Sequence, residues 1–133
     1  MEIRETLFRK SFSIETTSPY ITALDFMKKL SEYHKIYERK NSFETDGPST
    51  KSTLVFDVVE QLDAFSQISI NFSTSGENNM LYVDIQGDFV LRVDETGFFA
   101  ETFSEFYLKG IYPMMKKVSE RRVKELEVEI ERL

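Results

Sequence analysis

The clearest pattern in this chain is the alternation of apolar and polar residues between positions 53 and 97. Such alternation predicts antiparallel strands with one covered face. The apolar positions expected on that face are Leu54, Phe56, Val58, Ile68, Ile70, Phe72, Leu81, Val83, Ile85, Phe89, Leu91 and Val93. The polar positions expected mainly on the other face are Asp57, Glu60, Gln67, Ser69, Asn71, Asp84 and Arg92. The residues Ser75–Asn79, between two of these strands, are typical of a hairpin loop.

The residues after Gly87 indicate whether the same alternate positions stay on the covered face beyond this glycine. A two-residue turn at this glycine would bring Arg92 and Asp94 to the covered face, where they would make a poor apolar set. An unbroken phase instead brings Phe89 and Leu91 to that face, as a covered sheet requires. Gly87 is therefore expected either to bend one long strand or to lie in a three-residue loop.

The segment before this alternation predicts a strand followed by a helix. Residues Ile3–Ile14 alternate imperfectly, which indicates a strand and is consistent with a bulge. Ser18 is a suitable N-cap and Pro19 suits a first helical turn, so a helix is expected over about residues 19–33. Residues Tyr33–Arg39 fit either a short second helix or the beginning of a strand.

Two further segments complete the predicted organisation. Gly47 and Pro48 break regular structure, so residues Asn41–Ser52 are expected to form a turn or a mobile loop. Residues 100–132 predict one long C-terminal helix, because apolar residues recur there at helical spacing. Pro113 is expected to kink this helix, since proline removes one helical hydrogen bond.

This order of elements resembles the helix-grip fold of the START-like superfamily, also called polyketide-cyclase-like or Bet v 1-like. The resemblance includes Ser18 and Pro19 at the start of the first helix and Phe103–Val118 in the last one. It implies a curved antiparallel sheet of five to seven strands wrapped around the long C-terminal helix, with one or two short helices after the first strand. The family typically has seven strands and the pattern here gives five or six. Either Ile36–Phe43 is a further strand, or the fold is a reduced variant.

The resemblance implies that the protein binds an apolar or amphipathic small molecule between the sheet and the C-terminal helix. The residues expected to line such a cavity are Phe56, Phe72, Phe89, Leu91, Phe103, Tyr107, Ile111 and Met114. The same side chains would also suit an ordinary close-packed core. Two other functions stay open. One is a protein-interaction or co-chaperone-like module that acts through an acidic sheet face or the C-terminal helix, and the other is a cyclase- or hydrolase-like enzyme that uses Tyr107.

The charge distribution bears on the choice of partner. The 133 residues suit one domain over residues 1–133, and their formal net charge is −6. This negative charge opposes binding to nucleic acid, whose phosphates must be neutralised by Lys and Arg. Residues 44–101 hold only Lys51 and Arg92 against eleven acidic residues, which predicts an acidic sheet face.

The residue types exclude several kinds of site. The chain has no Cys and one His, so cysteine nucleophiles are excluded, a zinc site is not expected, and His34, among polar neighbours, is expected at the surface. No glycine-rich phosphate loop is present, and we expect neither a cofactor nor a metal. The N-terminus lacks the apolar segment of a signal peptide, and the apolar runs are too short to span a membrane. We therefore expect a cytoplasmic protein that is a monomer or a homodimer.

Overall fold

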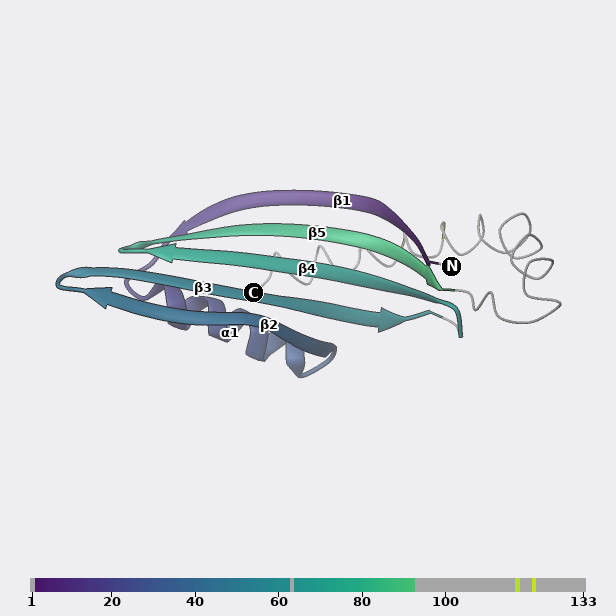
Figure 1. The fold of residues 1–133 in the computed structure, drawn as a ribbon, viewed down its shortest axis with the longest axis horizontal. Helices are drawn as coiled ribbons and strands as arrows, with labels where there is room; N and C mark the ends of the chain where they lie inside the picture. Colours follow the sequence, from purple (N-terminus) through teal and green to yellow (C-terminus); the bar gives the residue numbers. More distant parts are fainter. Residues whose placement is uncertain (1, 63, 93–116, 118–120, 122–133) are drawn as a thin grey trace.

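A computed structural model of the chain describes residues 2–62, 64–92, 117 and 121. Its elements are β1 (Glu2–Glu15), α1 (Pro19–Ser31), β2 (Lys35–Asp46), β3 (Ser49–Gln61), β4 (Ser66–Glu77) and β5 (Met80–Arg92). The strands form one antiparallel sheet in the order β1-β5-β4-β3-β2 (Figure 1). β2, β3 and β4 each pair with the strand that follows in the sequence, whereas β1 lies beside β5. The sheet thereby joins the two ends of the 2–92 segment.

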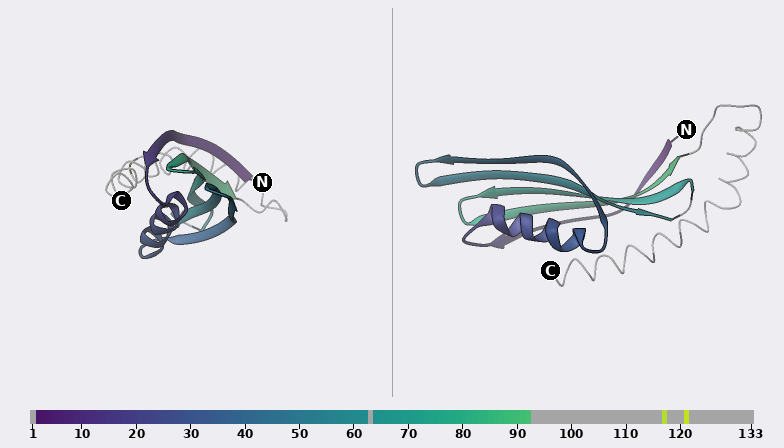
Figure 2. Two further views of the ribbon diagram at one scale, coloured as in Figure 1. Left: turned by 90° about the vertical axis from the view of Figure 1, so that its left-hand side faces the viewer. Right: turned by 90° about the horizontal axis from the view of Figure 1, so that it is seen from below.

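α1 packs against one face of the sheet, and this face carries the core (Figure 2). The buried core cluster consists of Ala23, Leu30, Leu54, Phe56, Val58, Ile68, Ile70, Phe72, Leu81, Val83 and Ile85. Two of its rings, Phe56 and Phe72, are stacked with centroids 4.8 Å apart. The predicted phase of the apolar positions in β3, β4 and β5 is therefore confirmed. Glu60 departs from its predicted side, because it pairs with Ile68 and so shares the apolar face.

β5 runs without interruption through Gly87, so the long bent strand is the alternative that the structure contains. Gly87 pairs with Phe8 of β1, and a Cβ atom at Gly87 would overlap the Phe8 ring. Only glycine leaves room for that ring on the apolar face. The register between β1 and β5 also shifts between Thr6 and Phe8, which explains the imperfect alternation of the first strand.

Pro19 begins α1 as expected, but Ser18 acts differently from the predicted cap. Within the described residues, the Ser18 hydroxyl makes no capping hydrogen bond. The Ser18 carbonyl instead accepts hydrogen bonds from the backbone N–H of Thr22 at 3.0 Å and from the Thr22 hydroxyl at 2.9 Å. The first turn is therefore held by Thr22 rather than by the Ser18 side chain.

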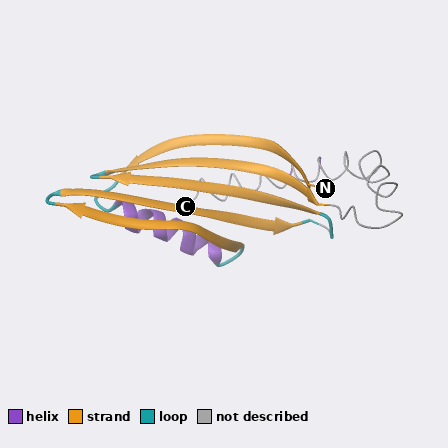
Figure 3. Ribbon diagram, viewed as in Figure 1, coloured by secondary structure: helices purple, strands orange, loops and turns teal. Residues whose placement is uncertain are grey.

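The predicted fold class is wrong in its architecture. Residues 2–62 and 64–92 form an open sheet of five strands with one helix, α1, against it (Figure 3). Each strand is 12 to 14 residues long, so these strands use most of the segment and leave no length for a sixth strand or a second helix there. The predicted C-terminal helix over residues 100–132 lies outside the described residues, apart from Lys117 and Arg121.

Two segments for which the sequence predicted more than one structure belong mainly to strands. Tyr33–Arg39 does not form a second helix, because β2 begins at Lys35. Asn41–Ser52 is not a mobile loop, because it contains the end of β2, the beginning of β3 and a tight hairpin at Gly47, whose φ is 60°. β2 exposes nearly all of its side chains, so it has no apolar face from which alternation could be read.

Candidate functional site

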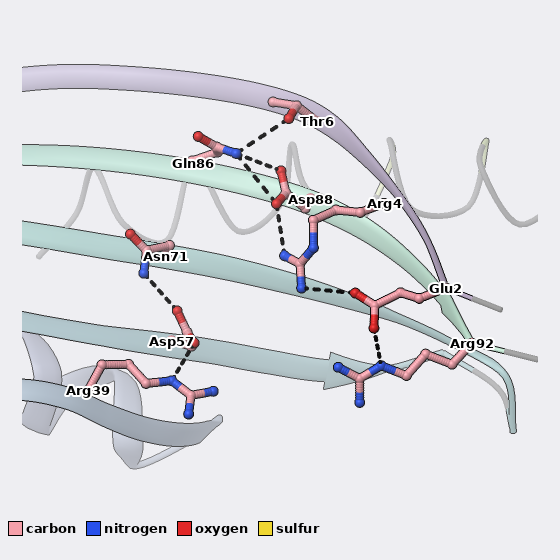
Figure 4. A network of polar contacts seen from close by, with 9 residues as sticks. All are labelled: Glu2, Arg4, Thr6, Arg39, Asp57, Asn71, Gln86, Asp88 and Arg92. Carbon is pink, nitrogen blue, oxygen red and sulfur yellow. Dashed lines mark hydrogen bonds and ion pairs between the residues drawn. The ribbon is translucent and has the colours of Figure 1, made fainter.

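The face of the sheet opposite α1 is polar and contains an open hollow of about 460 Å³. We call this the polar hollow, and side chains from all five strands line it: Arg4, Tyr37, Arg39, Asp57, Val59, Gln67, Ser69, Asn71, Gln86, Asp88 and Arg92. The strand alternation places these side chains here, because every second residue of a strand points away from the core. Figure 4 shows nine residues of the polar network on this face.

Asp57 holds one side of the polar hollow. Its carboxylate accepts a hydrogen bond from Nε of Arg39 at 2.8 Å and another from Nδ2 of Asn71 at 2.8 Å (Figure 4). Arg39 lies where the register of β2 against β3 shifts, between Glu38 and Lys40. The Asp57 side chain is 16% exposed and that of Arg39 is 58% exposed, so the carboxylate forms the floor and the guanidinium reaches outward.

Asp88 lies on the other side of the polar hollow and likewise accepts hydrogen bonds from two side chains. Its carboxylate lies 2.9 Å from Nη1 of Arg4 and accepts a second hydrogen bond from Nε2 of Gln86 at 3.1 Å. The Asp88 side chain is only 7% exposed, whereas that of Arg4 is 47% exposed. A nearly buried carboxylate needs such partners, because burial without them is costly.

A third ion pair extends the network to the ends of β1 and β5. Glu2 accepts a hydrogen bond from Nε of Arg92 at 3.1 Å, and its other oxygen lies 3.6 Å from Nη2 of Arg4. Carboxylates and guanidiniums therefore alternate along this face, as Figure 4 shows. The acidic sheet face predicted from residues 44–101 is not what these strands form, since Arg4 and Arg39 supply cations from β1 and β2.

Tyr37 adds an aromatic surface beside Arg39. The Lys35 ammonium and the Arg39 guanidinium both lie near the Tyr37 ring, 5.5 Å and 5.6 Å from its centroid. A hydrogen bond with Tyr37, followed by their Coulomb interaction, raises the pKa of Lys35 above its usual 10.5. Both side chains are exposed, so this cluster is a solvated edge of the polar hollow.

The arrangement is suited to binding rather than to metal chemistry. Arg39 and Arg92 each bind a carboxylate through Nε, and their side chains are 58% and 63% exposed, so a ligand can reach their terminal NH₂ groups. Guanidinium donors of this kind bind carboxylate and phosphate groups well. Among the described residues, no group of three or more His, Cys, Asp or Glu side chains could hold a metal ion.

The sequence-predicted cavity residues lie elsewhere. Phe56 and Phe72 are stacked in the core beneath α1, and Phe89 and Leu91 are fully buried on the same face of the sheet in β5. The other four predicted residues lie outside the described residues: Phe103, Tyr107, Ile111 and Met114. Tyr82 lies on the opposite face of β5 and is half exposed.

Sequence reasoning did not find the polar hollow as a site. The alternation did place Asp57, Asn71 and Arg92 on the polar face, and the register of β3 and β4 confirms the first two as neighbours. The alternation did not predict that β1 pairs with β5 and β2 with β3. These two pairings bring Arg4 and Arg39 to the polar face. Strand pairing between distant segments is not visible in a single alternating pattern.

Comparison with known proteins gives this chain no relatives: no family model matches it, and no curated protein sequence does. The START-like resemblance therefore stays a prediction. Within the described residues, no helix is both long and apolar enough to cross a membrane, and a cytoplasmic location also stays a prediction.

Proposed function

We propose that this protein is a binding protein that uses the polar hollow to hold a ligand carrying a carboxylate or phosphate group. The observation that carries the proposal is the pair of exposed guanidiniums, Arg39 and Arg92, whose terminal NH₂ groups a ligand can reach beside a hollow of about 460 Å³. Each is held from behind by a carboxylate, and such preorganisation lowers the entropic cost of binding.

The hydrogen-bond donors of the hollow favour an anion over a cation, although Glu2 beside it balances the charge of the third guanidinium. Its lining includes Arg4, Arg39 and Arg92 against Asp57 and Asp88, and both carboxylates already accept hydrogen bonds from two side chains. The neutral donors of Asn71 and Gln86 lie between them and can serve the remaining polar atoms of a ligand. The net charge of −6 opposes the approach of an anion from far away, but salt screens that repulsion beyond about 8 Å.

Calorimetry on the purified chain tests the proposal with two probes, citrate and inorganic phosphate. We expect saturable binding of at least one probe, and we expect Arg39→Gln and Arg92→Gln each to weaken it about fivefold or more, since each removes a charge-assisted hydrogen-bond donor. Arg9→Gln is the matched control, because Arg9 is an exposed arginine of β1 outside the polar hollow. Equal weakening by Arg9→Gln, or no saturable binding of either probe, contradicts the proposal.

A second candidate function is the binding of an apolar or amphipathic molecule on the other face of the sheet. Phe89 and Leu91 are the described residues that would line it, because both are apolar and lie on the face of the sheet that α1 covers. The proposed driving force is burial of ligand surface, worth about 25 cal/mol per Å² before ordering costs.

Native mass spectrometry of protein purified from cells, with a lipid-like fluorescent probe as a second readout, tests this candidate. Phe89→Trp should abolish probe uptake by filling the site, whereas Tyr82→Trp, on the opposite face, should leave it unchanged. Uptake that is the same in both variants, or no bound molecule and no probe uptake in the wild type, counts against it. The cyclase- or hydrolase-like alternative stays a prediction, since Tyr107 lies outside the described residues.

A further inference from the structure

β2 is an edge strand whose side chains are almost all exposed. It lies at the end of the strand order, and only Ile36 and Ser42 are partly covered. An edge strand carries a row of backbone N–H and C=O groups that face away from the sheet, and these can pair with another strand. The outward-facing residues can be identified from the register of the β2–β3 hairpin.

The hairpin closes with Asp46 opposite Ser49, so these two residues form a hydrogen-bonded pair around the two-residue turn. Hydrogen-bonded and non-hydrogen-bonded pairs alternate along an antiparallel ladder. Thr45 and Thr50 are then a non-hydrogen-bonded pair. Consistent with this, the Thr50 N–H donates to Oδ1 of Asn78 at 3.3 Å, and the Thr50 carbonyl accepts from the Asn78 N–H at 3.0 Å, both on the side away from β2.

The same alternation gives the other outward-facing residues of β2. Phe43 pairs with Ser52 and Asn41 with Leu54, two and four positions before the Thr45 pair, so both are non-hydrogen-bonded toward β3. The backbone groups of Asn41, Phe43 and Thr45 therefore point away from β3, toward the edge where no other strand of the described segments pairs. They form a continuous outward row that is symmetric about Phe43.

The sequence of this row is complementary to itself when it is read in the opposite direction. An antiparallel pair of two copies centred on Phe43 brings Phe43 opposite Phe43, Asn41 opposite Thr45, and Lys40 opposite Asp46. The outward N–H and C=O groups of Asn41, Phe43 and Thr45 would then meet each other in hydrogen-bonded pairs. Each Lys40 would face an Asp46 of the other copy, and opposite charges across strands are stabilising.

Other registers are less favourable. A shift that centres the pair on Glu44 would place two Glu44 carboxylates opposite each other, which is destabilising. A shift toward the beginning of β2 meets the irregularity between Glu38 and Lys40, where the ladder to β3 loses its register. A pair centred on Ser42 would also bring opposite charges together, Lys40 and Glu44, but it would place Glu38 opposite Asp46. Charged residues on an edge usually prevent pairing with other chains, whereas the register centred on Phe43 pairs Lys40 with Asp46 and opposes no like charges between residues 40 and 46.

We propose that two copies of this chain pair through β2 in the antiparallel register centred on Phe43, which joins two five-stranded sheets into one. Phe43 is 51% exposed, and its ring lies 5.2 Å from that of Tyr20. The two-fold axis therefore brings together an aromatic cluster on the α1 side of both copies. The paired segment is short, so the interface belongs to the small, weak class of below about 1,200 Å².

Sedimentation equilibrium of the full chain over a wide concentration range tests the proposal by exchanging the two charges. We expect a reversible dimer whose dissociation constant rises about tenfold or more in Lys40→Glu and in Asp46→Lys, because each change opposes like charges twice across the interface. The double variant, with both changes in one chain, should restore dimerisation, since the charges at these two positions would again be opposite across the interface.

Lys28→Glu is the matched control, because it reverses one exposed charge in the last turn of α1 and changes no residue of β2. It should leave the dissociation constant unchanged. A wild-type chain that stays monomeric at millimolar concentration overturns the proposal. So does a double variant that dissociates as readily as the single ones, or a control that dissociates as they do.

Discussion

The guanidinium of Arg4 lies 2.9 Å from the carboxylate of Asp88, 84 positions later in the chain. This pair ties β1 to β5 on the polar face, opposite the core. We expect Arg4→Ala to lower the free energy of unfolding by about 1–3 kcal/mol, because it removes the cation from a nearly buried carboxylate. Urea denaturation measures the change.

A double-mutant cycle shows whether that loss comes from the pair itself. The effects of Arg4→Ala and Asp88→Ala should not add, because either substitution alone breaks the interaction. Arg9→Ala, an exposed position on the same strand, should change stability by about 0.5 kcal/mol or less. Strict additivity of the two variants would mean that the contact does not stabilise the fold.

Gly87 and Phe8 are expected to behave as one packing unit. Gly87→Ala should destabilise the protein by about 1–3 kcal/mol, because the added methyl group overlaps the Phe8 ring. Phe8→Leu in the same chain should recover part of the loss by shortening the opposing side chain. The comparison is Gly47→Ala, where space is open but φ is 60°: Phe8→Leu should recover nothing there. Equal recovery at both glycines would contradict this packing.

The stacked rings of Phe56 and Phe72 are expected to dominate the core. Phe72→Ala should cost about 3–5 kcal/mol, because it leaves a cavity beside a fully buried ring. Tyr33→Ala, at a side chain that is largely exposed between α1 and β2, should be nearly neutral. Thermal unfolding of the two variants gives the comparison, and similar melting temperatures would argue against this core.

The hydrogen bond between Lys35 and Tyr37 makes a prediction about pH. The pKa of Lys35 is raised above 10.5 in the folded chain, so its contribution to stability is complete below pH 10.5 and is lost as the pH rises through the raised pKa. Tyr37→Phe removes the hydrogen bond and should return the Lys35 pKa toward its ordinary value. Titration of the Lys35 side chain by NMR measures its pKa in the wild type and in Tyr37→Phe. A wild-type pKa at or below 10.5 would refute the prediction.

The alternation of apolar residues was sufficient to predict the core face of β3, β4 and β5. It worked because each of these strands has one face toward the core and one toward water, so burial and sequence have the same period. β2 could not be predicted in this way, because its burial does not alternate along the strand. Both of its faces are exposed, so its residues carry no period, and Tyr33–Arg39 fitted a helix equally well.

The candidate site needed information that a single sequence does not contain. Asp57 and Asn71 could be placed on one face by alternation, but their guanidinium partner, Arg39, depends on the register of a strand with no apolar pattern. Arg4 likewise depends on the pairing of the first described strand with the last. A local pattern gives the direction of a side chain but not its partner across the sheet.

An anion in the polar hollow would bind to the terminal NH₂ groups of Arg39 and Arg92. The most direct measurement follows the guanidinium signals of all arginines by NMR while citrate or phosphate is added. We expect saturable shifts that are largest at Arg39 and Arg92 and small at Arg9. Shifts of equal size at every arginine, or none that saturate, would contradict it.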